Sequence, residues 1–579
     1  MFLILCVQVI TLFYYGGRKA GFHEDELYSY YSSNKTAGLF VNDREWTSGE
    51  SFRNELVVLP GEQFRYGVVK QMQSWDVHPP LYYYMLHTVC SLTPGIFSKW
   101  QGIAVNLIGF VLSFGLLAYA AYLTAVYPLV KKPAASENEV LSYRKRGYFL
   151  SAAVCTMWGF GGAVISGVMF IRMYQWLTVF VLLCLCIHLK AVASRKMGWK
   201  FYASLAVTVF LGFLTQYYYI IFHFFLGAAF CLYLLKEKKW KQLLAYAGAC
   251  AAGLLAALLY YPSALSHIFK GYRGTEAVGE FADASNTMER LQFFAGLFDK
   301  YMIGNMLAVW LLIFCLLAIT AWAFRKRGKL SEKLLTLPVV LMLFAAAGYF
   351  FTVAKTALLL GETSNRYELP IYGVLVLLLL YSTYMVQTSV LQGFYSRDAL
   401  KEEAAGTFVR RNRDMTVIVL SVLMVVLNLT GNKVFFLYPE EAQIQEFIRQ
   451  KKEVPVVVLY NDASQTHIWW LLDELSEYEH IYLASISGEG DLLNTESFQK
   501  GIRAKDGTSG TNDRTGLIVY MADCENQEEE LYRLLGGSPA PAQDRIIQDE
   551  TSQDEIQSGQ KVCKKIAEKN MWTIYEVNP

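Results

Sequence analysis

The chain has 579 residues, 54% of them hydrophobic, with a mean hydropathy of +0.27 and a formal net charge of +2 at pH 7. Soluble domains of this length need a more polar surface, so the composition excludes an ordinary soluble protein, and the small net charge argues against a nucleic-acid partner. Eight of the ten cysteines lie in or next to apolar segments without C-x-x-C spacing, which is typical of packing residues. Cys524 and Cys563 lie in the polar C-terminal region, where they could form a disulfide.

Apolar segments with few charges recur along the chain, each near the ~20 residues that a helix needs to cross a bilayer. The first segment starts at the N-terminus and lacks the basic region and cleavage site of a signal peptide, so we interpret it as an uncleaved helix. The eleven predicted spans are 1–17, 101–129, 148–170, 172–190, 200–216, 218–235, 241–262, 302–324, 333–353, 367–386 and 414–431.

The short segments between these spans alternate in charge. Five of them are rich in lysine and arginine, and the positive-inside rule assigns such segments to the cytoplasm. The N-terminus is then cytoplasmic, and everything after residue 431 is extracytoplasmic. The five basic segments are 130–147, 190–200, 236–241, 325–333 and 387–413.

Residues 18–100 form the first extracytoplasmic loop of this scheme and contain another apolar stretch at 79–93. At about 1.5 Å per residue this stretch is shorter than the hydrocarbon core of a bilayer, and polar residues such as His87 interrupt it. A crossing here would also reverse the orientation of every later basic segment. We therefore predict a helix that lies in the outer membrane interface, with Tyr82 at the level of the lipid headgroups.

The region 432–579 is polar and acidic, in contrast to the preceding 1–431. Short apolar segments alternate there with helical patterns, which is typical of a small α/β domain. The predicted strands are 454–460, 480–486 and 516–522, the predicted helices are 464–477 and 525–535, and the predicted loops are 501–515 and 538–560. The sequence thus predicts an α-helical polytopic membrane domain, 1–431, followed by an extracytoplasmic α/β domain, 432–579.

Three consecutive acids follow the first span, in the segment HEDELYSY at 23–30. If this segment is helical, Asp25 and Tyr28 share one face, while Glu26 points about 100° away. Membrane anchoring does not require such acids, so one of them is a candidate catalytic carboxylate. A solvated helix start, where acids suit the helix dipole, explains the same residues equally well.

A second polar cluster, WDVHPPLYY at 75–83, precedes and enters the predicted interfacial helix. Two prolines at the start of a helix restrict the chain and would hold Asp76 and His78 rigidly at the interface. The alternative is a simple helix-entry turn in which Asp76 serves as a cap.

Two segments that pair arginine with tyrosine, FIRMY at 170–174 and SNRYELP at 364–370, lie at outer turns of the predicted topology. Arginine at a membrane edge is often an anchor whose charged end reaches the interface. Arg172 and Arg366 lie on the same predicted face, however, and two arginines there also suit a lipid phosphate, which a guanidinium binds bidentately.

Taken together, these motifs resemble those of a known family. DE-x-Y-S after the first span, D-x-HPPLYY, RMY and RY-x-LP occur in the same order in bacterial glycosyltransferases related to the protein O-mannosyltransferases and to the aminoarabinose transferase of lipid A, which belong to the GT-C superfamily. HPPLYY is the most specific of these motifs, and the resemblance covers residues 1–431 in order and topology. It implies a GT-C-type membrane glycosyltransferase of about eleven spans.

The resemblance implies a sugar donor linked to polyprenyl phosphate in the cell membrane. The acceptor would be a hydroxyl of an envelope polysaccharide, lipid or protein that attacks on the extracytoplasmic side. By analogy Asp25 would be the general base, with Glu26 beside it. The other tyrosines and acids of the motifs are candidate substrate contacts, namely Tyr28, Asp76, Tyr82, Tyr174 and Tyr367.

The leaving group of such a transfer is already a lipid phosphate, so cations that stabilise its charge matter more than a general acid. Arg172 and Arg366 are the main candidates, and His78 and Lys355 are weaker ones. Many relatives carry an acid where this chain has Phe170, so a divalent metal has only weak support, no cofactor is certain, and metal dependence stays open.

Two other function classes compete with a transferase. A glycolipid flippase or transporter would need ionisable residues within the spans, where His223 is the main one and suits a packed, hydrogen-bonded role. A non-catalytic membrane scaffold with an external binding domain would make the Asp25 and His78 clusters incidental.

Overall fold

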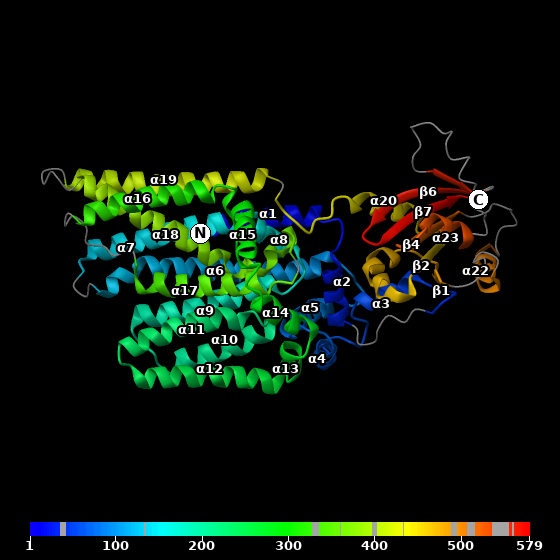
Figure 1. Cartoon of the computed structure of the whole chain (residues 1–579), viewed down its shortest axis with the longest axis horizontal. Coiled ribbons are helices and arrows are strands. Elements are labelled where there is room, and N and C mark those ends of the chain that lie inside the picture. Colours follow the sequence, from blue (N-terminus) through cyan, green and yellow to red (C-terminus); the bar gives the residue numbers. More distant parts are fainter. Residues whose placement is uncertain are drawn as a thin grey trace. The chain divides into compact units, whose positions relative to one another are not determined.

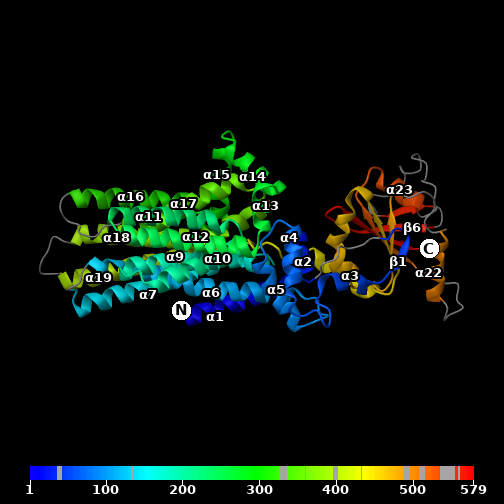
Figure 2. The same cartoon turned by 90° about the horizontal axis from the view of Figure 1, so that it is seen from below.

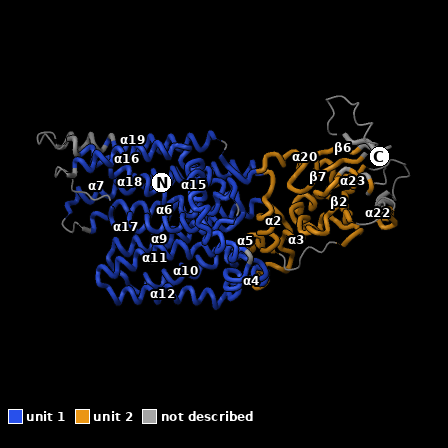
Figure 3. The backbone as a smooth tube through the Cα atoms, in the orientation of Figure 1, with its two compact units in different colours: residues 1–19, 70–86, 99–437 blue, residues 20–69, 87–98, 438–579 orange. Residues whose placement is uncertain are grey.

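The computed structural model describes residues 1–34, 42–131, 135–326, 335–358, 360–395, 402–431, 433–487, 495–506, 516–534, 555–558 and 561–578. The chain folds into two compact units (Figure 3). Unit 1 comprises residues 1–19, 70–86 and 99–437, and unit 2 comprises residues 20–69, 87–98 and 438–579. Unit 2 therefore combines the C-terminal region with most of the first predicted loop.

Long apolar helices that run nearly along one direction make up unit 1 (Figures 1 and 2). Eight described helices are long and apolar enough to cross a membrane, or nine if a bent pair is one span, and α1 and α10 are shorter apolar helices. Each predicted span overlaps one of these helices or the bent pair, which confirms an α-helical multi-pass membrane protein. The helices are α1 (Phe2–Arg18), α6 (Lys99–Val126), α7 (Glu137–Gly159), α8 (Gly162–Met169), α9 (Tyr174–Ser194), α10 (Trp199–Thr215), α11 (Tyr219–Lys236), α12 (Trp240–Tyr260), α16 (Leu307–Lys326), α17 (Leu337–Thr356), α18 (Asn365–Tyr395) and α19 (Glu402–Thr430).

The segment 148–170 differs from the straight span that the sequence predicts, because α7 and α8 meet at an angle of 62°. The glycine-rich break between them lies where other segments approach closely. A Cβ at Gly161 would lie 2.5 Å from the sulfur of Met302, and one at Gly162 would lie 2.7 Å from the carbonyl oxygen of Lys433. Residues without a side chain are therefore needed where the chain turns.

Three short helices connect α12 to α16, namely α13 (Ser263–Phe269), α14 (Tyr272–Ala282) and α15 (Thr287–Phe298). Arg290 of α15 ties them to the bundle. Its guanidinium donates to two backbone carbonyls at the end of α17, at 3.3 and 2.6 Å, and pairs with Glu280 of α14.

A mixed sheet in the order β1-β3-β2-β4-β7-β6-β5 forms the centre of unit 2. The three predicted strands are confirmed as β2, β3 and β4, which run parallel and are buried at every position, because both faces of the sheet are covered. The strands are β1 (Glu45–Thr47), β2 (Val456–Tyr460), β3 (Ile481–Ser485), β4 (Leu517–Ala522), β5 (Glu555–Ser558), β6 (Lys561–Lys569) and β7 (Trp572–Asn578).

Helices before and between these strands complete the described fold. The helix predicted at 79–93 is confirmed as α5, which begins directly after Pro80. The helix predicted at 464–477 is mainly a 3₁₀ segment, η5, followed by one α-helical turn. The helices are α2 (Glu24–Asn34), α3 (Gly49–Leu56), α4 (Tyr66–Trp75), α5 (Leu81–Leu92), α20 (Glu441–Lys451), η5 (Asp462–Leu471), α21 (Leu472–Leu475), α22 (Glu496–Asp506) and α23 (Gln527–Leu534).

Parts of the two predicted loops are helix or strand, so the prediction of loops is wrong there. In the loop 501–515, residues 501–506 belong to α22, and the rest lie outside the described residues. In the loop 538–560, β5 occupies 555–558, and the rest also lies outside them. The strands β6 and β7 were missed because β6, KVCKKIAEK, carries charges at most positions and offers no apolar run.

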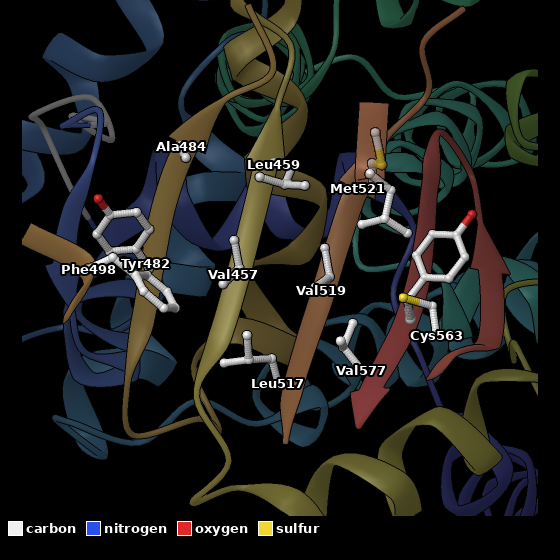
Figure 4. Close-up of a cluster of buried hydrophobic side chains, with 12 residues drawn as sticks. Val457, Leu459, Tyr482, Ala484, Phe498, Leu517, Val519, Met521, Cys563 and Val577 are labelled. Carbon is white, nitrogen blue, oxygen red and sulfur yellow. The ribbon is translucent and has the colours of Figure 1, made fainter. Parts of the chain in front are cut away.

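One side of the sheet packs a cluster of buried side chains (Figure 4). Val457 of β2 and Val519 of β4 lie at its centre, and Cys563 of β6 lies at one side. Cys524 packs against the same cluster. In the part of the chain that the structure describes, no disulfide joins these two cysteines, which serve as apolar packing groups.

A buried charge cluster lies beside this core. The Nζ atom of Lys569 is 2.8 Å from Oε2 of Glu441 and 2.7 Å from Oε1 of Glu474, and all three side chains are at most 7% exposed. Asp473 is also buried and interacts electrostatically with Lys569. Burial raises the pKa of Glu441 to about 7 and that of Asp473 to about 6, despite the attraction of Lys569.

We expect unit 2 to lose stability as the pH rises from about 5 to about 8, because Glu441 and Asp473 keep protons in the folded state that the unfolded chain has released. This contribution is complete below the ordinary carboxyl pKa and is lost as the pH passes through the raised values. Thermal unfolding of the full chain in detergent, followed by tryptophan fluorescence across this pH range, measures the effect. A melting temperature that rises with pH would contradict it.

Candidate functional site

Three hydrogen-bonded polar side chains, Asp76, His78 and Arg172, lie in unit 1. They connect the loop before α5 to the turn between α8 and α9. Arg172 donates from Nη2 to Nε2 of His78 at 3.0 Å, and Nδ1 of His78 lies 2.7 Å from Oδ2 of Asp76. Because a guanidinium can only donate, Nε2 of His78 accepts and Nδ1–H donates to Asp76. The three residues, all predicted from sequence, are therefore held in one orientation.

The charges of Asp76, His78 and Arg172 shift one another's pKa values. Burial and the positive charge of Arg172 lower the pKa of His78 from its ordinary value, although Asp76 opposes them. Burial would raise the pKa of Asp76, but the neighbouring His78 and Arg172 outweigh it and lower that pKa. The arrangement favours a neutral imidazole between an ionised carboxylate and an arginine.

Tyrosines surround these three side chains. Arg172 donates from Nη1 to the hydroxyl of Tyr83 at 3.0 Å, and the hydroxyl of Tyr261 donates to the carbonyl of His78 at 3.4 Å. Tyr82 is fully buried and packs edge-on against Tyr83 with ring centroids 5.8 Å apart. Sequence reasoning missed Tyr83 as the direct partner of Arg172, although it lies in the HPPLYY motif.

A second cationic group adjoins the same turn. The guanidinium of Arg366, at the start of α18, lies over the rings of Phe170 and Tyr367, 5.3 and 5.0 Å from their centroids. Tyr174 packs on Phe170 and, edge-on, on Tyr367. Arg366 is only 7% exposed and Arg172 only 3%. The turn at 170–174 thus contributes one arginine and supports the other.

Lys355 has a different environment. It is 1% exposed and donates to the backbone carbonyl of Asp283 and the side chain of Asn286, between α14 and α15. These two contacts hold the connection between α12 and α16 and involve neither arginine. Arg273 of α14, by contrast, interacts electrostatically with His78, and no motif in the sequence indicated it.

The acidic segment at 23–30 belongs to unit 2 and begins α2. The backbone N–H of Asp25 donates to Nδ1 of His23 at 3.1 Å, and the backbone N–H of His23 donates to Oε2 of Glu26 at 2.7 Å. These reciprocal bonds cap the helix. The side chain of Asp25 is 21% exposed, whereas Glu26 is fully buried, so Glu26 serves the helix start. Tyr28 packs edge-on against Trp469.

Among the described residues, no group of three or more His, Cys, Asp or Glu side chains could hold a metal ion. Phe170, in the turn before α9, is 1% exposed and lies under the Arg366 guanidinium, so an aromatic ring supports the cation there.

No protein-family model matches the sequence, and no curated protein matches it. Among solved structures, the chain is similar to ArnT from Cupriavidus metallidurans bound to undecaprenyl phosphate, with a TM-score of 0.50 and 12% identity over 99% of this chain and 97% of that one. A second crystal structure, of ArnT from the same organism in the apo state, matches with a TM-score of 0.44 and 12% identity over 95% and 96% of the two chains. The first likeness shows that the chain has the ArnT fold, which confirms the GT-C fold expected from the motifs.

Proposed function

We propose that this protein transfers a sugar from a polyprenyl-phosphate-linked donor to an acceptor hydroxyl on the extracytoplasmic side of the cell membrane. The observation that carries the proposal is a pair of buried arginines, Arg172 and Arg366, at one turn of a membrane unit with the ArnT fold. The two buried guanidiniums make this turn cationic, and a guanidinium can bind a lipid phosphate bidentately. The crystal structure of ArnT with undecaprenyl phosphate supports this class of donor.

In the proposed reaction, Asp25 accepts the proton of the acceptor hydroxyl while its oxygen attacks the anomeric carbon of the donor sugar. The bond from that carbon to the phosphate oxygen breaks, and polyprenyl phosphate leaves with the electron pair. Arg172 and Arg366 stabilise the charge that grows on the phosphate. His78 and Asp76 orient Arg172, and Tyr174 and Tyr367 support Arg366.

The remaining predicted residues have lesser roles in this proposal. Tyr28 and Tyr82 belong to the motifs that we expect to contact the substrates, and each packs against a neighbouring aromatic ring. Glu26 positions Asp25 by capping α2. Lys355 fixes the connection that carries Arg273, a further cation for the donor phosphate. No divalent metal is required, because the two arginines can neutralise the leaving group.

Binding of the lipid phosphate tests the donor half directly. We expect undecaprenyl phosphate to raise the melting temperature of the purified protein and undecaprenol, which lacks the phosphate, to leave it unchanged. Arg366→Ala should reduce the shift, because it leaves the phosphate charge less compensated. Arg144→Ala removes an exposed arginine of α7 and should keep the full shift. Equal shifts with phosphate and alcohol would contradict the donor assignment.

The orientation in the membrane is a separate expectation. By the positive-inside rule, the basic segments 130–147 and 387–413 predict a cytoplasmic N-terminus and an extracytoplasmic unit 2. In a background without reactive cysteines, a membrane-impermeant maleimide added to intact cells should label Asn526→Cys and leave Asn138→Cys unlabelled. The reverse labelling pattern would contradict an extracytoplasmic site.

A further inference from the structure

A cavity of about 690 Å³ lies within unit 2, between the segment that enters α2, the start of α20 and the end of β6. Its size lies within the ~300–1,000 Å³ of typical small-ligand sites. Neither the donor chemistry nor the proposed base uses it.

The walls of this cavity are acidic. Glu24, Glu440, Glu441 and Glu568 all line it. The lining Lys569 is paired with Glu441 and with Glu474, and the lining Glu568 is paired with Lys565, which leaves Glu24 and Glu440 as the remaining lining carboxylates. The excess of carboxylates repels phosphates and sulfates and attracts an ammonium group.

The cavity also has a rigid apolar side. Phe22 lines it and is fixed by ring contacts with Phe97 and Tyr30, at centroid distances of 5.1 and 6.2 Å. Tyr438, which precedes α20, also lines it. Aromatic rings and carboxylates in the same cavity suit a polyhydroxylated ligand, whose C–H face packs on a ring while its hydroxyls donate to oxygens.

The same segment carries the proposed base. His23 and Glu24 line the cavity and directly precede Asp25. A Cβ at Gly21 would clash with the carboxylate of Glu441, so the chain entering α2 lies directly on the cavity wall. The cap formed by Glu26 and the backbone of His23 keeps this entry in place. A ligand in the cavity would therefore lie beside the helix start that presents Asp25.

We infer that this cavity binds the acceptor, and that the acceptor is an amine-bearing sugar chain free of phosphate, whose ammonium groups pair with Glu24 and Glu440. The assignment of this ligand as the acceptor rests on the proposed transfer. Its binding to the cavity, however, requires no donor and no turnover. It excludes a polyanionic acceptor such as a multiply phosphorylated lipid.

Titration calorimetry on the full chain in neutral-lipid nanodiscs tests the inference without any sugar transfer. We expect a short glucosamine oligomer to bind, and the N-acetylglucosamine oligomer of the same length, which lacks the charge, to bind roughly tenfold more weakly. The double variant Glu24→Gln/Glu440→Gln should lose roughly the same factor, and raised salt should shrink the difference. Glu446→Gln changes a carboxylate of α20 that lies outside the cavity and should bind like the wild type.

Equal affinity for the two oligomers, tighter binding of a sulfated oligosaccharide, or an equal loss in Glu446→Gln would overturn the inference. An unchanged melting temperature of the double variant, followed by tryptophan fluorescence, shows that unit 2 is folded, so a loss of oligomer binding then reports on the cavity. If the oligomer binds as expected but no sugar is transferred, the transfer proposal fails while the cavity remains a site for amine-bearing glycans. If transfer proceeds without oligomer binding, the inference fails alone.

Discussion

Replacement of Asp25 by asparagine is expected to lower turnover by roughly 10²–10⁴-fold, the range typical of general-base catalysis, and to leave donor-lipid binding nearly unchanged. The amide keeps the size of the side chain and the backbone bond to His23, but it cannot accept the proton of the acceptor hydroxyl. Single-turnover transfer and undecaprenyl phosphate binding, measured on the same preparation, separate the two effects.

Glu26→Gln is the matched control for this variant. The side chain of Glu26 is buried and accepts from the backbone N–H of His23. Glutamine can accept the same bond, so the variant should keep most of the activity and lose at most about 1 kcal/mol of stability, the usual value of a cap. Full activity in Asp25→Asn together with inactive Glu26→Gln would move the general base to Glu26.

Arg172→Gln is expected to have the second largest effect, a fall in kcat/KM of roughly 10²–10³-fold, because a charged donor to the leaving phosphate is lost. The variant also removes a positive charge that lowers the pKa of His78, so that pKa should rise. Any limb of the pH–rate profile that reports His78 should then move to higher pH.

Arg172→Lys distinguishes charge from geometry. Lysine keeps the charge, but one ammonium cannot reproduce the fork that reaches Tyr83 and His78 at 3.0 Å each. We expect the pH profile to return toward that of the wild type while activity recovers only in part. An unchanged kcat/KM in both variants would contradict a role for Arg172 in the transfer.

Much of the membrane fold could be predicted from the sequence, because a span needs only length and hydropathy. The site in unit 1 could be predicted in part for a related reason. Arg172 and Asp76 stand out as charges at the ends of apolar segments, and the prolines before α5 mark where the chain is fixed. Their convergence on His78, however, depends on packing between segments far apart in the chain, which no local pattern contains.

The features that the sequence did not indicate have physical reasons of their own. β1 is three residues long and exists through its antiparallel pairing with β3, more than 400 positions later. The bend at Gly161 and Gly162 depends on neighbours that approach within contact distance. Lys569 ends a polar strand, a position where a lysine is usually solvated. It is buried here because three acids from α20 and α21 surround it.

The central claim is that a sugar leaves a polyprenyl phosphate on this protein. The most direct measurement uses a polyprenyl-phosphate sugar radiolabelled in the sugar, purified protein in nanodiscs, and a glucosamine oligomer as the acceptor. We expect label to appear on the oligomer in step with the release of polyprenyl phosphate, without added divalent metal, and Asp25→Asn to slow both by roughly 10²–10⁴-fold. Label that stays on the lipid with wild-type protein, although donor and oligomer both bind, would contradict the account.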